Sequence, residues 1–276
     1  MVLAFNGKRL DISSPVVMGI LNITPDSFFN QGNWGSVDKQ LRQVEQMLTD
    51  GASIIDIGAI STRPGASPVT KTEELNRLVP SLKAIRHRFP ECFLSVDTFF
   101  PMVAQEAVSL GADMINDIYG GRYDGKMFEI IGKSNVPYIL MHMKGKPDTM
   151  QINPEYQDIV AEVAYFFDHQ AQKLRELGAS QIVIDPGFGF GKTIDHNFEL
   201  LERLQEFESL GFPLAVGISR KSMIRKTLGI PADEALNGST VLNTVALLKG
   251  ANILRVHDVK EAMEAVKLTE AVGGLR

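Results

Sequence analysis

Two cations stand at alternate positions near the carboxyl end of the chain, where an apolar run that begins at residue 250 leads into Arg255 and His257. Side chains two apart on a strand point to the same face of a sheet, so both would project toward one ligand. A pair of cations at a strand end attracts an anion, and Arg contacts a phosphate through two donors at once. The alternative is an Arg that pairs with a carboxylate and a His that bonds to backbone.

A second group of donors follows another apolar run. Hydroxyl and cationic side chains occupy four consecutive positions: Ser219, Arg220, Lys221 and Ser222. At the start of a helix, free backbone N–H groups would add to their attraction for an anion. Lys221 could also form a Schiff base, as in aldolases, and a solvated cationic turn is the third possibility. A position beside the two cations of the last strand favours the anion site.

Three other apolar runs end in acidic or amide residues, namely Asp97, Asn116 and Asp185. Acceptors and donors that line one pocket can bind the edge of a purine- or pterin-like ring through hydrogen bonds. Each acid could instead cap the helix that follows it. After Asp185, three glycines are interleaved with Phe188 and Phe190, which allows the backbone to approach a flat ligand closely. A structural turn with two core phenylalanines is the alternative there.

Two long stretches rich in turn formers carry further candidates. The first covers residues 23–35 and follows Asn22, whose neutral oxygen suits Mg²⁺, an ion that prefers oxygen ligands and keeps waters. The second covers residues 59–72 and contains a rigid turn with one cation: Thr62, Arg63 and Pro64. Long ordered loops at a functional face are candidates for lids.

The elements that must position these residues alternate in type along the chain. Eight short, mostly apolar runs are typical of parallel strands covered on both faces: residues 16–22, 53–58, 93–97, 113–116, 137–142, 181–185, 213–217 and 252–257. Amphipathic segments separate them, with a long helix expected at 154–178. Polar residues end nearly every run, as in a (β/α)8 TIM barrel, whose active site draws on all eight strand ends. We therefore predict an α/β fold with one barrel domain over residues 1–276; a doubly wound sheet is the second choice.

Bulk composition limits the class of function. A net charge of −5 and a pI near 5.6 give no indication of a nucleic-acid or anionic-membrane surface. The chain carries one cysteine, Cys92, so a disulfide within it is impossible, which is typical of a reducing compartment. Neither a signal peptide nor an apolar stretch of about 20 residues is evident, so we expect a cytoplasmic protein.

Several segments, in this order, resemble those of the dihydropteroate synthases of folate biosynthesis. They include Gly-Ile-Leu-Asn-Ile-Thr-Pro-Asp-Ser-Phe at 19–28, Ser-Thr-Arg-Pro-Gly at 61–65, Asp-Pro-Gly-Phe-Gly-Phe-Gly-Lys at 185–192, Ser-Arg-Lys-Ser at 219–222 and Arg-Val-His-Asp at 255–258. The resemblance implies a (β/α)8 barrel and a homodimer. It also implies an Mg²⁺-assisted condensation of 6-hydroxymethyl-7,8-dihydropterin diphosphate with para-aminobenzoate, a substrate that sulfonamides resemble, to give 7,8-dihydropteroate and diphosphate.

The same resemblance implies roles for individual residues. The pterin would be held by Asp97, Asn116, Asp185 and Lys221, in a slot lined by Met141 and Gly217. The diphosphate and its Mg²⁺ would be held by Asn22, Arg255 and His257. The aminobenzoate site would be shaped by Thr62, Arg63, Pro64, Phe190, Ser219 and Lys221. The residues expected to act in the chemistry are Asp97, Asp185, Lys221, Arg255 and His257.

One departure and three rival functions accompany this resemblance. Where the family usually continues Ser-Asp-Gly-Gly, this chain has the bulkier segment 29–34, which lacks the acid. A pterin-binding methyltransferase domain would share the ring-holding residues, a Schiff-base aldolase would use Lys221, and a non-catalytic homologue would only bind pterin. The cations at Lys221, Arg255 and His257 favour a diphosphate substrate over a methyl donor.

Overall fold

The computed structural model describes residues 1–24, 37–60, 69–146 and 149–273. Its centre is an eight-stranded parallel sheet in the order β8-β7-β6-β5-β4-β3-β10-β9. The strands are β3 (Val16–Asn22), β4 (Ile54–Gly58), β5 (Phe93–Asp97), β6 (Met114–Asp117), β7 (Tyr138–Met141), β8 (Ile182–Asp185), β9 (Ala215–Val216) and β10 (Ile253–Val256). A parallel bridge between Ile184 and Leu214 joins β8 to the ninth strand and closes the ring. The predicted barrel, with strands near all eight expected positions, is confirmed.

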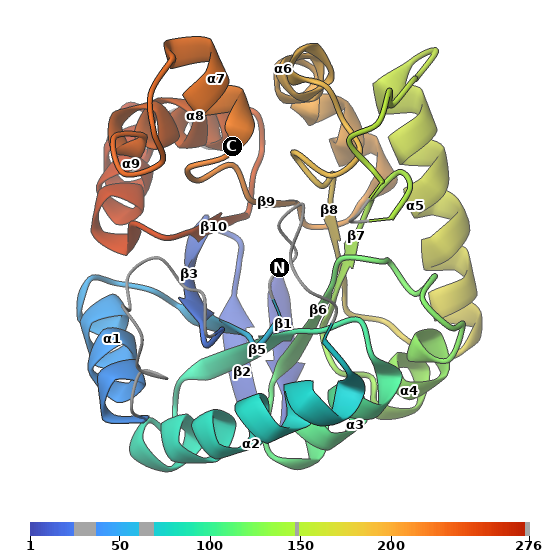
Figure 1. Cartoon of the computed structure of the whole chain (residues 1–276), viewed down its shortest axis with the longest axis vertical. Coiled ribbons are helices and arrows are strands. Elements are labelled where there is room, and N and C mark those ends of the chain that lie inside the picture. Colours follow the sequence, from blue (N-terminus) through green and yellow to red (C-terminus); the bar gives the residue numbers. More distant parts are fainter. Residues whose placement is uncertain (25–36, 61–68, 147–148, 274–276) are drawn as a thin grey trace.

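Helices form an outer layer around these strands (Figure 1). They are α1 (Val37–Thr49), α2 (Lys71–Arg88), α3 (Pro101–Ser109), α4 (Met127–Ser134), α5 (Ile159–Glu176), α6 (Ile194–Glu202), η1 (Leu204–Leu210), α7 (Ser222–Leu228), α8 (Leu236–Leu248) and α9 (Val259–Ala271). The main apolar core lies between the outward faces of the strands and the helices. The long helix expected at 154–178 begins later, because Asp158 caps it by accepting a hydrogen bond from the backbone N–H of Ala161. No helix in the described part of the chain is long and apolar enough to span a membrane.

A hairpin that we did not predict closes the amino-terminal end of the barrel. It consists of β1 (Val2–Phe5) and β2 (Lys8–Asp11), joined by Asn6 and Gly7 in left-handed conformations. Asn-Gly between short strands is a strong hairpin signal, because a type I′ turn requires a positive φ at both positions. Leu3 of β1 and Ile12, which directly follows β2, pack against the inward side chains at the amino-terminal ends of the barrel strands. This packing fills the barrel floor, and the polar strand ends lie at the opposite end.

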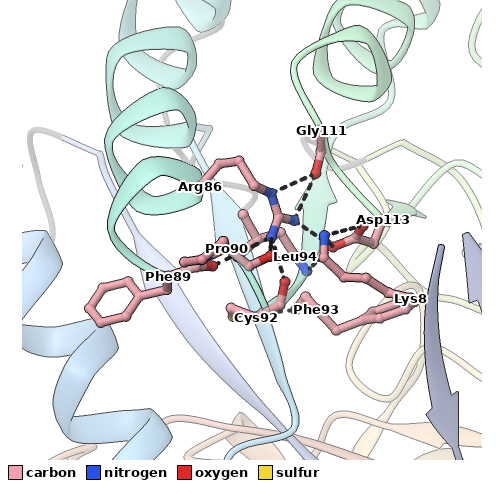
Figure 2. A network of polar contacts seen from close by, with 9 residues as sticks. All are labelled: Lys8, Arg86, Phe89, Pro90, Cys92, Phe93, Leu94, Gly111 and Asp113. Carbon is pink, nitrogen blue, oxygen red and sulfur yellow. Dashed lines mark hydrogen bonds and ion pairs between the residues drawn. The ribbon is translucent and has the colours of Figure 1, made fainter. Parts of the chain in front are cut away.

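Charged groups also fasten the hairpin to the barrel (Figure 2). The fully buried carboxylate of Asp113 pairs with Lys8 of β2 at 2.9 Å and with Arg86 of α2. It also accepts a hydrogen bond from the backbone N–H of Leu94 at 2.9 Å. Arg86 donates to four backbone carbonyl groups as well, including that of Cys92 at 2.7 Å. The network ties hairpin, helix and two strands together, far from the other end of the barrel.

We expect Asp113→Asn to lower the free energy of unfolding by about 3 kcal/mol, because one neutral amide at this buried position cannot satisfy two partly buried cations. Urea unfolding followed by circular dichroism measures this. The matched control is Asp11→Asn, whose carboxylate is two-thirds exposed and lies 3.7 Å from the amino terminus, and it is expected to leave the midpoint unchanged. Equal midpoints for wild type and Asp113→Asn would show that the network adds nothing to stability.

Candidate active site

The last inward-facing residues of six neighbouring strands meet at the open end of the barrel, and four of them are polar. Strand register places Asn22 beside Gly58, Gly58 beside Asp97, and Asp97 beside Asn116. On the other side of the ring, Met141 of β7 lies beside Asp185 of β8. Because alternate residues on a strand share a face, these positions all point inward above the apolar floor. The tertiary structure therefore brings the predicted ring-binding residues into one layer.

Arg255 lies across this layer and pairs with two carboxylates. Its Nε donates to Oδ2 of Asp56 at 2.6 Å, and its Nη2 donates to Oδ2 of Asp97 at 2.7 Å. Burial by itself would lower the pKa of Arg255, but the two carboxylates raise it, so the guanidinium stays charged. The structure thus realises the alternative in which this Arg pairs with carboxylates, and the charge is held rigidly at the mouth.

Asp56 of β4 is a site residue that we did not predict. It is fully buried, and its Oδ2 accepts from Arg255 and, at 3.1 Å, from Nδ2 of Asn116. Its Oδ1 has no hydrogen-bond partner among the described residues. One carboxylate therefore orients two of the predicted binding residues. The available signal was its place in Asp-Ile-Gly at a strand end, but the sequence gives no indication of its partners.

The surroundings raise the pKa values of two further carboxyl groups, those of Asp97 and Asp185. The pKa of Asp97 is raised to about 7, mainly by burial and also by the nearby Asp56, Asp117 and Asp185, against the opposing charge of Arg255. Burial likewise raises the pKa of Asp185, although Lys221 and a hydrogen bond of 2.8 Å from the backbone N–H of Gly187 oppose the shift. Both groups titrate closer to neutrality than exposed carboxyl groups do.

Lys221 lies opposite the acids and beside an aromatic ring. Its Nζ donates to the carbonyl oxygen of Phe188 and lies 4.8 Å from the centre of the Phe190 ring. Burial lowers its pKa to about 8, while Asp185 raises it. A side chain at Gly217 would lie 3.8 Å from Cβ of Arg255 and 3.9 Å from Nζ of Lys221. Glycine therefore keeps open the space between the two cations.

The two other cationic candidates, His257 and Arg220, have different partners. Nδ1 of His257 lies 3.1 Å from Oγ of Ser219, and the side chain of His257 is exposed at the rim. Arg220 instead pairs with Asp258 at 2.7 Å and donates to the carbonyl oxygen of Ala232, so its role is to hold the loop. The predicted anion-binding turn thus contributes Ser219 and Lys221 to the mouth.

Of the other predicted groups, only Asn22 belongs to the described residues. Asn22 lies at the end of β3 with its Oδ1 beside Gly58. The turn of Thr62, Arg63 and Pro64 lies outside the described residues. The segment 29–34, where the sequence departs from the family pattern, also lies outside them.

Comparisons with known proteins identify the family of the chain. A family model described as pterin binding enzyme matches residues 18–257. The dihydropteroate synthase of Escherichia coli K12 is 45% identical over 273 residues, which cover 98% of this chain and 96% of that protein.

Solved structures give the same result. The structure of Yersinia pestis dihydropteroate synthase with a sulfonamide drug complex has a TM-score of 0.94 at 43% identity and covers 99% of both chains. That of the Xanthomonas albilineans enzyme with 4-aminobenzoic acid has a TM-score of 0.91 at 37% identity, covering 100% of this chain and 99% of that one. The chain belongs to the family of pterin-binding enzymes and, within it, to the dihydropteroate synthases.

Proposed function

We propose that this chain joins 6-hydroxymethyl-7,8-dihydropterin diphosphate to para-aminobenzoate, giving 7,8-dihydropteroate and diphosphate. One observation supports the proposal: a layer of inward side chains at the barrel mouth contains Asp97, Asn116 and Asp185. Two cations complete this layer, because Arg255 pairs with Asp97 and Lys221 interacts with Asp185. A pterin presents a donor–donor–acceptor edge, and its diphosphate is an anion, so this layer offers a partner for each part. Similar proteins whose structures hold a sulfonamide or 4-aminobenzoic acid support the second substrate.

The carboxylates would bind the ring and then assist its chemistry. Asp185 and Asp97 accept N–H donors of the heterocycle when ionised, while Asn116 and Lys221 donate to its acceptors. As the carbon–oxygen bond to the diphosphate lengthens, positive charge develops on the methylene carbon and spreads into the dihydropterin ring. The two carboxylates stabilise that charge electrostatically. The Met141 side chain and the hydrogen atom of Gly217 would form the walls of a slot for a flat ring.

The leaving diphosphate would meet a different set of groups. The permanently charged Arg255 and the rim residue His257 would stabilise the oxygen that takes the bonding electron pair. The arylamine nitrogen is neutral and carries a free lone pair, so it attacks the methylene carbon without a strong base. The ammonium group that results then loses its proton to water. No covalent intermediate with the enzyme is needed for this substitution.

A Mg²⁺ ion would assist only together with the substrate. Within the described residues no group of three or more His, Cys, Asp or Glu side chains could hold a metal. The neutral Oδ1 of Asn22 at the end of β3 offers one oxygen ligand. This fits Mg²⁺, which commonly keeps waters and binds through substrate phosphates rather than in an all-protein cage. When bound, the ion would neutralise charge on the departing diphosphate.

We expect a bell-shaped pH profile of kcat/KM. Protonated Asp97 has lost its negative charge and presents an O–H donor where the ring also donates, so activity should fall as the pH drops below about 7. Lys221 donates as an ammonium group, so activity should fall as the pH rises above about 8. Steady-state rates measured over this range test both limbs, and Lys221→Gln should abolish the alkaline limb alone. A flat profile through both values would contradict these roles.

The reaction itself is tested by following diphosphate release from the dihydropterin diphosphate with Mg²⁺, with and without para-aminobenzoate. Release coupled to dihydropteroate formation is the expected result. Binding of the pterin without product under every metal condition would exclude the synthase. Methyl transfer to a corrinoid acceptor would then be the reaction to test, because a methyltransferase domain shares the ring-binding residues.

We further propose that residues 1–276 act as a single barrel domain within a cytoplasmic homodimer. Exposed apolar side chains on two adjacent late helices support the dimer, namely Val241 and Leu248 of α8 and Leu268 of α9. The lone, buried Cys92, whose thiol pKa burial raises to about 12, is compatible with a reducing compartment. Sedimentation velocity distinguishes a dimer from a monomer.

A further inference from the structure

A buried lysine outside the proposed chemistry lies directly behind the site. The side chain of Lys192 is almost fully enclosed, and its Nζ lies 3.0 Å from each of three acceptors. These are Nδ1 of His142 and the carbonyl oxygens of Gly187 and Phe190. A fourth acceptor, the carbonyl oxygen of His142, lies at 3.4 Å. Burial lowers the pKa of Lys192 well below its usual value, and the charge of Asp185 opposes this shift. In the ammonium form, its three N–H groups match the three nearer acceptors. Burying a lysine is costly unless its donors are satisfied, so this arrangement needs a reason.

The two carbonyl groups belong to the loop that follows β8, and this loop is pressed against the end of β7. Gly187, Gly189 and Gly191 all have positive φ. A Cβ atom at Gly187 would collide with the carbonyl oxygen of His142, and one at Gly191 with that of Lys144. At Gly187 and Gly191 the loop can follow this path only with glycine. The carbonyl oxygens of Gly187 and Phe190 face the interior, where Lys192 satisfies them.

The same loop presents three groups to the mouth. The N–H of Gly187 donates to Asp185, the carbonyl oxygen of Phe188 accepts from Lys221, and the ring of Phe190 lies beside the Lys221 ammonium group. Two of these three residues, Gly187 and Phe190, also bind Lys192 through their carbonyl oxygens. The loop therefore lies between two lysines, one at the mouth and one behind it.

The imidazole partner is suited to this contact. Burial lowers the pKa of His142, and the neighbouring cations Lys192, Arg122 and Lys144 lower it further, so the ring is neutral and can offer a lone pair at Nδ1. His142 is itself fixed to the loop's strand, since its backbone N–H donates to the carbonyl oxygen of Asp185 at 2.9 Å. The lysine thus links β7 to the loop at the level of the proposed ring-binding acid.

We propose that Lys192 is a positioning residue: with His142 it fixes the glycine loop so that Asp185, Lys221 and Phe190 are held ready for the two substrates. It does not touch the substrate itself. The inference rests on the proposed function for the identity of the substrates.

The test compares three variants of the full-length protein. Lys192→Met removes all donors at similar length, and Lys192→Gln keeps two donors without the charge. The control Lys144→Met removes a neighbouring, partly exposed cation whose partners are Glu162, Tyr156 and the carbonyl oxygen of Glu155. We expect KM for both substrates to rise about tenfold or more in Lys192→Met, less in Lys192→Gln, and not in the control.

The split between KM and kcat separates positioning from simple stabilisation. A lysine that only stabilised the fold would lower the amount of active enzyme and leave KM unchanged in the folded fraction, which would overturn the proposal. If Lys192→Met cannot be obtained folded, hydrogen exchange of the wild-type segment 186–192 replaces it. Protection without ligand supports a loop held in advance, and exchange at the rate of a free peptide overturns it. A wild type that forms no dihydropteroate would instead refute the proposed function.

Discussion

Arg255→Met is expected to reduce kcat/KM about a thousandfold and to destabilise the protein as well. The variant removes the fixed charge that would stabilise the leaving diphosphate, an effect typically worth about two to three orders of magnitude in rate. It also leaves the carboxylate of Asp56, which is fully buried, without its cation, which costs about 3 kcal/mol or more. Diphosphate release and urea unfolding measure the two losses separately.

A double variant distinguishes these two effects. Asp56→Asn combined with Arg255→Met removes the fully buried unpaired charge at position 56, while Asp97 lacks its cation in both variants. An amide oxygen remains available to Asn116, whose Nδ2 donates to this position in the wild type. We expect much of the stability to return and the activity to remain lost. Recovery of activity in the double variant would show that Arg255 serves only to neutralise Asp56.

Asp185→Asn is expected to reduce kcat/KM by about two to three orders of magnitude, mainly through weaker pterin binding. The amide oxygen can still accept from the N–H of Gly187, as the carboxylate does at 2.8 Å, so the loop should persist. An NH2 group replaces the other oxygen and faces a donor of the heterocycle, and a polar mismatch of this kind is strongly rejected. Isothermal titration with the dihydropterin diphosphate, together with steady-state kinetics, gives both quantities.

Asp113→Asn supplies the matched control for this variant. Asp113 is as buried as Asp185, but it belongs to the network at the barrel floor that Figure 2 shows. Asp113→Asn should lower the free energy of unfolding and leave KM unchanged. Asp185→Asn should raise KM for the pterin and leave the free energy of unfolding nearly unchanged. If both variants bind pterin like the wild type, Asp185 has no part in ring recognition.

Local pattern was sufficient for much of the architecture. Near-continuous apolar runs that end in a polar residue predict buried parallel strands, and strand periodicity fixes which side chains point inward. Asp97, Asn116 and Asp185 could therefore be assigned to one mouth without coordinates, and register confirms that the first two are neighbours. The amino-terminal hairpin was missed although its Asn-Gly turn is a local signal, because its strands of four residues are short and only partly apolar.

The sequence by itself determined which residues reach the mouth, because strand and turn geometry depend on a few neighbours in the chain. Only the tertiary structure decided which charges meet. Arg255 is separated from Asp56 by 199 positions and from Asp97 by 158, and Lys192 from His142 by 50. No local pattern encodes these pairs, since closing the ring and pressing one loop against a neighbouring strand bring them together. The same closure buries the groups, and burial is the largest cause of the shifted pKa values of Asp97 and Lys221.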